Sequence, residues 1–185
     1  MFDPAVGTHP SSLAPIKEPD IHGSSSLRIQ SASEDRILSF FLNLSTEERT
    51  CRFAGAVSDA AIRVWRQSID RDYYVCVGQE RAHQPIGLVE LFGSRATGWQ
   101  RPELALSIRQ ALDTFRLRLH LLEIGLSVAN EKGAVDVFMC LEGADNARQR
   151  ALASHYGGIE DASGIVVIPC GFVSVNGVSS WYGAL

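Results

Sequence analysis

Three arginines stand close together in the second half of the chain and could bind an anion. Arg109, Arg116 and Arg118 surround the start of a predicted helix. Guanidinium groups grip phosphate through forked, charge-assisted hydrogen bonds, and the dipole at a helix N-terminus also favours negative charge. A solvated basic turn would have the same residues. The pattern therefore indicates either a phosphate-binding site or an exposed helix start.

Glu103 has the neighbours that a general base needs. In a strand over residues 103–108, alternation places Glu103 on one face together with the small residues Ala105 and Ser107. These neighbours leave room for a substrate beside the carboxylate. A carboxylate whose pKa is raised by burial can take a proton from an ammonium group, which frees a neutral amine to act as a nucleophile. A solvated or ion-paired strand glutamate is the alternative interpretation.

The histidines and cysteines do not indicate other chemistry. The five histidines, at positions 9, 22, 83, 120 and 155, have no mutual spacing typical of metal ligands. The four cysteines, at positions 51, 76, 140 and 170, lie far apart, and we expect reduced, buried thiols. Cys140 is expected to be an inert core thiol because apolar residues flank it in a predicted strand. No metal site is predicted.

Charge and hydropathy argue against several classes of partner. Lys and Arg number 17 against 21 Asp and Glu, so the net charge of -4 offers no general attraction for nucleic acid or an anionic membrane. The most apolar stretch, residues 164–175, is shorter than the roughly 20 residues that a membrane helix needs. The N-terminus lacks the order of regions found in a secretory signal, which favours a cytoplasmic location.

A change in composition separates a tail from a folded region. Residues 1–26 contain Pro4, Pro10, Pro15, Pro19 and a run of three serines, which predicts a flexible N-terminal tail. The rest of the chain, residues 27–185, is long enough for one hydrophobic core and is predicted to be a single domain.

Helix signals occur five times in that domain. Serine or asparagine caps, one of them in a capping box, precede four of the helices, and the fifth has apolar residues at helical spacing. The helices are expected after Ser33, from Ser45 to about residue 53, after Ser58, from Phe115 to a stop at Gly133, and from Asn146 to Gly157.

Strand signals fall between these helices. They cover residues 27–30, 73–77, 86–92, 103–108, 135–141 and 165–168. The short links in the middle predict an antiparallel meander, which then passes into βα units. The expected fold is α/β, of the α+β kind, with a mixed, mostly antiparallel central sheet and helices on both faces.

Several strings resemble the GNAT superfamily of acyl-CoA-dependent N-acyltransferases. Residues 44–49 (LSTEER), Arg52, Phe53 and residues 57–62 (VSDAAI) resemble the opening helices of the GNAT domain in bacterial protein-lysine acetyltransferases. Residues 103–108 (ELALSI) resemble the fourth strand of the family. Residues 145–152 (DNARQRAL) resemble its later helix. The resemblance covers roughly residues 27–168.

This resemblance implies an N-acetyltransferase that passes an acetyl group from acetyl-CoA directly to an amine. Glu103 would be the base, and Asn146 would contact the cofactor or act only as a helix cap. The acceptor would be an amine-bearing small molecule or a protein lysine. The oligomeric state stays open, with a homodimer as one alternative because such domains often pair. The fourth strand would contact the pantetheine arm through Ala105, Leu106, Ser107 and Ile108.

Two motifs of the family are altered in this chain. The glycine-rich turn that receives pyrophosphate before the helix has Thr114, Arg116 and Arg118 at its glycine-like positions. These three residues are therefore assigned to phosphate. The tyrosine that protonates the leaving thiolate in many relatives is replaced by Ala153. Tyr156 lies about 60° further around the helix and would either substitute for it or pack at the helix end.

These departures leave a second hypothesis open. A GNAT-like domain without its glycines and its tyrosine could be a catalytically inactive binding or regulatory module. A thermal shift with acetyl-CoA and free CoA distinguishes the two hypotheses, because an enzyme should be stabilised by these ligands and no shift at millimolar CoA would exclude it.

Overall fold

The computed structural model describes residues 25–29, 34–140, 146–175 and 178–181. Seven of the described strands form one sheet in the order β1-β2-β3-β4-β5-β7-β6. Only the β4–β5 pair is parallel, and the other neighbours are antiparallel. The strands are β1 (Ser25–Ile29), β2 (Tyr74–Arg81), β3 (Gln84–Ser94), β4 (Gly98–Ile108), β5 (Asp136–Cys140), β6 (Ile159–Glu160) and β7 (Ile165–Pro169). A separate hairpin joins β8 (Phe172–Val175) and β9 (Val178–Trp181).

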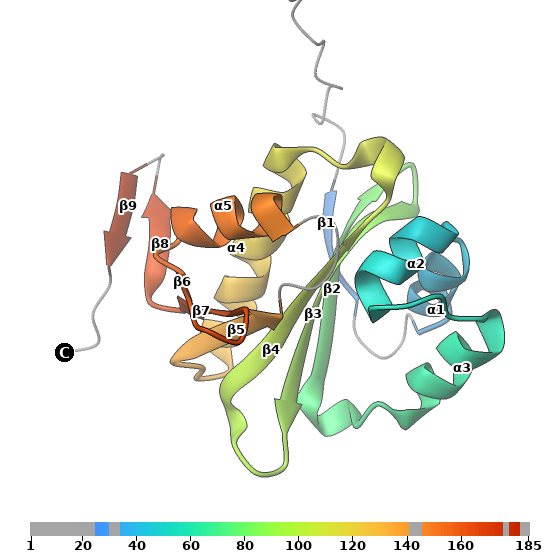
Figure 1. Ribbon diagram of the computed structural model, residues 1–185, viewed down its shortest axis with the longest axis horizontal. Coiled ribbons are helices and arrows are strands. Elements are labelled where there is room, and N and C mark those ends of the chain that lie inside the picture. The colour runs from blue at the N-terminus through green and yellow to red at the C-terminus, as the bar shows by residue number, and fades with distance from the viewer. Residues whose placement is uncertain (1–24, 30–33, 141–145, 176–177, 182–185) are drawn as a thin grey trace, which may run out of the picture.

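Three helices cover one face of the sheet. They are α1 (Glu34–Leu42), α2 (Thr46–Phe53) and α3 (Asp59–Ser68), and Figure 1 shows them together on one side. The predicted capping box is present, since the Ser45 hydroxyl accepts from the Glu48 amide and the Glu48 carboxylate accepts from the Ser45 amide. Ser58 caps α3 as predicted. The core on this side packs Ile37, Phe40 and Phe41 against the sheet.

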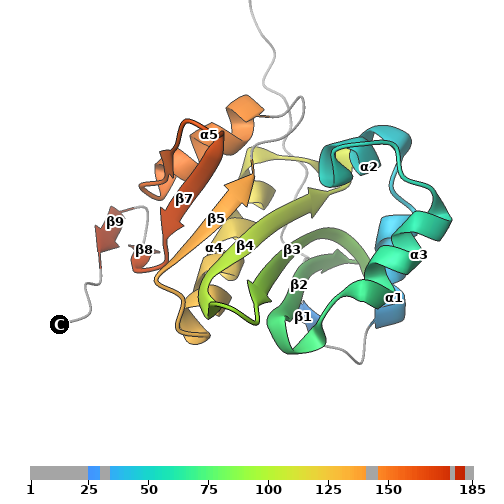
Figure 2. The same ribbon diagram turned by 60° about the horizontal axis from the view of Figure 1, so that its bottom comes forward.

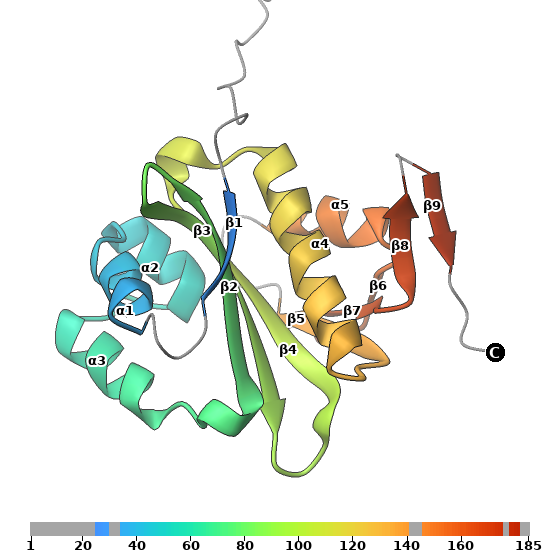
Figure 3. The same cartoon turned by 180° about the vertical axis from the view of Figure 1, so that it is seen from behind.

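Helices α4 (Phe115–Glu131) and α5 (Asn146–His155) cover the other face, as the view from behind shows (Figure 3). The apolar stripe of α4 packs on β3 and β4, with Leu121 and Leu122 fully buried. Gly125 permits this close approach, because an added Cβ would lie 2.7 Å from a methyl group of Val89. Gly133, with φ of 82°, follows the helix end as predicted.

The two parallel strands β4 and β5 separate soon after they meet. They share one residue pair, Glu103 with Phe138, and from Leu104 onward that edge of β4 has no strand partner within the described residues. Figure 2 shows the arrow of β4 running toward α2 while the arrow of β5 turns toward α5. The separation opens the sheet at its centre.

The predicted fold class is confirmed. The mixed, mostly antiparallel sheet carries helices on both faces, and each predicted helix and strand that falls in the described residues is present. Strands β2, β3 and β4 extend beyond their predicted limits, and β6, β8 and β9 were not predicted. Strand β1 begins at Ser25, two residues before the expected domain start, and the rest of the proposed tail lies outside the described residues. No described helix combines the length and apolarity needed to cross a membrane.

Candidate functional site

Two adjoining pockets lie where β4 and β5 separate. The inner pocket, of ≈ 320 Å³, is lined by residues 51–54 of α2 and its C-cap, residues 103–106 of β4, and by Met139, Cys140 and Gln149. The outer pocket, of ≈ 460 Å³, runs from α2 past residues 106–108 to the turn before α4 and the start of α5. Both are lined by Cys51, Arg52, Leu106 and Gln149, so they form one continuous site.

Glu103 lines the inner pocket at the point where the strands separate. The predicted alternation along β4 is present. Leu104 belongs to the core under α4, whereas Ala105 and Ser107 lie on the opposite face of the sheet, next to their β3 partners Glu90 and Leu88. Glu103 is half-buried and interacts electrostatically with Arg52. The carboxylate is therefore placed beside a cavity and beside a positive charge.

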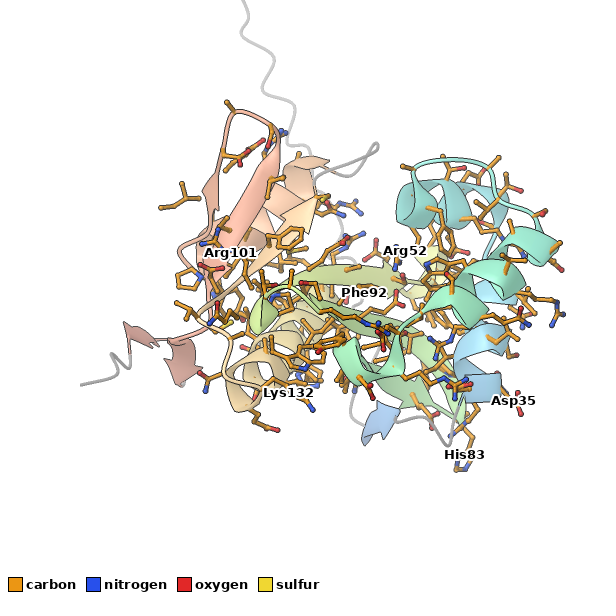
Figure 4. The ribbon with its side chains drawn as sticks, turned by 90° about the horizontal axis from the view of Figure 1, so that it is seen from below. Asp35, Arg52, His83, Phe92, Arg101 and Lys132 are labelled. Atoms are coloured by element: carbon orange, nitrogen blue, oxygen red, sulfur yellow. The ribbon has the colours of Figure 1, made fainter. Side chains whose placement is uncertain are left out.

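A buried ion pair supports this wall of the site. Arg52 contacts the Glu90 carboxylate through Nε at 2.9 Å and through a terminal nitrogen at 2.8 Å. Glu90 has no exposed surface, and its other oxygen accepts a hydrogen bond from the Tyr74 hydroxyl at 2.8 Å. The guanidinium lies over the rings of Phe53, Trp65 and Phe92, and Figure 4 shows Arg52 next to Phe92.

The ionisation of this cluster follows from its surroundings. Burial lowers the pKa of Arg52, but the attraction of Glu90 outweighs burial, so the pKa of Arg52 is raised. Burial first, and then the charge of Glu90, raise the pKa of the Tyr74 hydroxyl, which keeps that hydroxyl a donor. The sequence interpretation missed Glu90. Its signal was a lone charge inside the apolar run of residues 86–92.

The turn before α4 holds its own ion pair. Asp113 comes directly before Thr114, whose hydroxyl caps α4 by accepting from the Leu117 amide. Both carboxylate oxygens of Asp113 contact Arg118, at 2.7 and 2.5 Å, and the two side chains are only 11% and 10% exposed. Arg148 of α5 lies 3.7 Å from the same carboxylate.

The three arginines that the sequence placed near this turn are not brought into one site. Arg118 lines the outer pocket. Arg116 is exposed and lines neither pocket, and the guanidinium of Arg109 packs over the ring of Phe40. Of the predicted group, the described structure thus places Arg118 alone at the pocket, already in contact with a carboxylate.

Two neutral polar groups of the outer pocket are buried without a partner. The Ser107 hydroxyl and the Gln149 amide oxygen make no hydrogen bond within the described residues. A buried polar atom without a hydrogen bond costs free energy, so such atoms in a pocket wall mark contacts for a polar ligand.

Comparison with known proteins identifies the architecture. No protein-family model matches the sequence, and no curated protein matches it. Solved structures do match. The GNAT domain of S. lividans PAT has a TM-score of 0.62 and 19% identity, over 78% of this chain and 88% of that one. Spermidine N-acetyltransferase from Vibrio cholerae, in complex with CoA and spermine, has a TM-score of 0.57 and 13% identity, over 80% and 93%. The chain has the GNAT fold.

PaiA N-acetyltransferase from Thermoplasma acidophilum, in complex with coenzyme A, is a further structure with this fold. Its TM-score is 0.52 with 14% identity, over 78% of this chain and 96% of that one. The GNAT fold expected from the sequence resemblance is confirmed. Both pockets lie where the central strands β4 and β5 of this fold separate.

Two site predictions concern α5 of the GNAT fold. Asn146 is the first residue of α5, as expected for a cap, but its side chain lies outside the described part of the chain. Tyr156 is buried against α4, and its hydroxyl donates to the Glu123 carboxylate at 2.9 Å. Tyr156 lines neither pocket, so the structure supports the packing interpretation over the general-acid one.

Replacing Tyr156 with phenylalanine tests that assignment. We expect Tyr156→Phe to lower the free energy of unfolding by about 0.5–1.5 kcal/mol, because one hydrogen bond is lost while the ring still packs. Urea denaturation measures the change. The variant should transfer acetyl groups at the same rate as the wild-type protein. A large loss of rate in the variant would show that the Tyr156 hydroxyl takes part in the reaction.

The cysteine prediction needs correction. Cys76 and Cys170 are buried as expected, but Cys51 and Cys140 are exposed and line the inner pocket. The prediction for Cys140 was wrong because this residue ends β5, beyond the one pair of β5 with β4, and lines the pocket where the two strands separate. No group of three or more potential metal ligands occurs in the described residues.

Thiol labelling should divide the cysteines into two classes. Burial and then the Glu90 charge raise the pKa of Cys76, and burial with Asp136 raises the pKa of Cys170 to about 12. Because the thiolate is the reactive form, we expect iodoacetamide to modify Cys51 and Cys140 at least about tenfold faster. Peptide mass spectrometry follows each site, and equal rates at all four would contradict the pocket geometry.

Proposed function

We propose that this protein is an N-acetyltransferase that passes an acetyl group from acetyl-CoA to an amine by direct attack. The observation that carries the proposal is the separation of β4 from β5. Glu103 lies at the point where the two strands separate, and the two pockets lie along the opening. A thioester arm lying along the free edge of β4 would bring its carbonyl to Glu103.

The reaction uses few groups. Glu103 takes a proton from the acceptor ammonium, and the neutral nitrogen attacks the thioester carbonyl carbon. The nitrogen of the tetrahedral adduct loses a second proton to solvent, and the adduct collapses to the neutral amide with cleavage of the carbon–sulfur bond, the sulfur leaving with the bonding electrons. A thiol has a pKa of about 8.5, so the thiolate is an acceptable leaving group and can take its proton from water. This accounts for a site in which Tyr156 has no part.

The binding roles follow the pocket walls. The exposed edge of β4, residues 105–108, would pair with the amides of the pantetheine arm, and Ser107 and Gln149 would add side-chain contacts. Glu103 lines the inner pocket, where its carboxylate would lie beside a cationic acceptor. We therefore propose an amine-bearing small molecule or a protein lysine as the acceptor, and the cytoplasm as the location, because thiols stay reduced there.

Thermal shift and thiol release test the proposal together. Acetyl-CoA at millimolar concentration should raise the melting temperature by mass action and slow the labelling of Cys51 and Cys140. Polyamines or lysine peptides should then cause release of free thiol from acetyl-CoA. An unchanged melting temperature together with unchanged labelling would refute the proposal.

The alternative, a binding module without catalysis, is favoured by one observation. Asp113 and Arg118 stand paired where a glycine turn would leave the helix start open. Stabilisation by acetyl-CoA with no amine-dependent thiol release would support this module over the enzyme.

A further inference from the structure

We propose that the acyl donor is recognised through its neutral pantetheine arm and that the diphosphate of CoA adds little to binding. The inference rests on the proposed function and names the part of the donor that the outer pocket recognises. It follows from which polar groups of that pocket are already paired within the protein and which are not.

The cationic groups of the outer pocket are paired with carboxylates of the chain. Arg118 holds Asp113 through two contacts, and Arg148 lies 3.7 Å from the same carboxylate. Arg52, the third arginine in the pocket lining, contacts the buried Glu90. A diphosphate would have to compete with an internal carboxylate for each of these guanidinium groups.

A backbone donor of the turn is paired as well. One oxygen of Glu48 accepts from the Gln110 amide at 2.5 Å, while the other accepts from the Ser45 amide at 2.6 Å. Glu48 thereby bridges the start of α2 and the turn before α4. Gln110 lines the outer pocket, so its backbone amide would otherwise be a donor for an anion there.

The net charge of the pocket also disfavours a polyanion. Three carboxylates, Glu47, Glu48 and Asp113, balance the three arginines in the described lining, and Glu90 neutralises one of those arginines from behind. Phosphate sites usually have an excess of donors and positive charge. This lining has no such excess.

The buried polar atoms of the outer-pocket lining that have no partner within the described residues are neutral. Ser107 Oγ and Gln149 Oε1 are buried in the wall of the same pocket and make no hydrogen bond within the described residues. An amide oxygen such as Gln149 Oε1 accepts from an N–H, and a hydroxyl both donates and accepts. The two amide groups of a pantetheine arm offer both kinds of partner, so the unpaired groups match the arm and not the diphosphate.

Isothermal titration with acetyl-pantetheine and acetyl-CoA tests the inference on the full chain. We expect the two dissociation constants of the wild-type protein to agree within about tenfold, since a single gained charge-assisted contact is worth about that factor. Raising the salt from about 50 to about 500 mM should leave their ratio unchanged, because no exposed ion pair to the diphosphate is there to be screened.

Asp113→Asn should create the missing anion site. In this variant Arg118 no longer faces a carboxylate, so we expect the affinity for acetyl-CoA to rise about tenfold. The affinity for acetyl-pantetheine should stay within about twofold of the wild-type value. Asp136→Asn is the matched control, because it frees Arg101 on the surface, away from both pockets. It should change neither affinity.

The outcomes separate the inference from the proposed function. A wild-type preference for acetyl-CoA above about 100-fold that fades with salt would overturn the inference alone. Weaker binding of acetyl-CoA by Asp113→Asn would do the same. If that variant does not fold, the salt comparison on the wild-type protein decides. Binding of neither ligand to either protein would overturn both the inference and the proposed function.

Discussion

Replacing Arg52 with alanine is expected to lower the free energy of unfolding by about 3–5 kcal/mol, because it leaves a buried carboxylate without its counterion. Glu90 has no exposed surface and keeps only the Tyr74 hydroxyl as a hydrogen-bond donor in the variant. The stacking of the guanidinium on Phe53 and Trp65 is lost as well. Urea denaturation, compared at equal m-value, measures the effect.

Arg101→Ala is the matched control for this prediction. Arg101 also makes two contacts with one carboxylate, that of Asp136, at 2.6 and 2.8 Å, but its side chain is 59% exposed. An exposed pair of this kind contributes about 0–1 kcal/mol. Combining Arg52→Met with Glu90→Leu should recover most of the loss, because an apolar pair removes both charges. Equal effects of Arg52→Ala and Arg101→Ala would contradict the burial argument.

Glu103→Gln is expected to lower the rate of acetyl transfer by about 10²–10⁴-fold while donor binding stays unchanged, because the amide has the same shape but cannot accept the proton. Steady-state thiol release with a saturating amine measures kcat, and titration with acetyl-CoA measures donor affinity.

The matched control changes a carboxylate far from the reaction. Glu160 lies on β6 and pairs with Arg150, and it lines neither pocket. Glu160→Gln should therefore keep the wild-type rate. A Glu103→Gln variant with full activity would place the base elsewhere.

Local signals in the sequence determined the elements of the fold. Ser45 and Glu48 predicted a capping box that is present, and the apolar spacing after Phe115 predicted α4 with its end near Gly133. These signals act between residues a few positions apart, so they can be read without knowledge of distant contacts. The alternation that set Glu103 opposite Leu104 is local in the same sense.

Strand limits and additional strands were harder to predict. Strand β4 begins at Gly98 because Gly98 pairs with Ser94 of β3 across the turn of the hairpin, and β6 forms through its pairing with β7. Such short or extended strands depend on partners elsewhere in the chain, and their own residues have weak preferences. The pairing of these strands could therefore not be predicted from local sequence patterns.

The chemistry of the site was decided by the tertiary structure. The sequence alone placed Arg118 at a helix start, where it could bind phosphate, but only folding paired it with Asp113 and brought Arg148 from α5 to the same carboxylate. Whether a charge is available to a ligand depends on every group that packs around it, and these groups come from distant parts of the chain.

The same reason explains the other differences between expectation and structure. Cys140 became a pocket residue because β4 leaves β5 at Glu103, and Tyr156 became a core residue because α5 packs on α4. The sequence by itself determined the order of elements, the caps and the face of β4 that carries Glu103. Only the tertiary structure decided which side chains are buried, paired or open to a ligand, since burial and pairing are properties of contacts between distant residues.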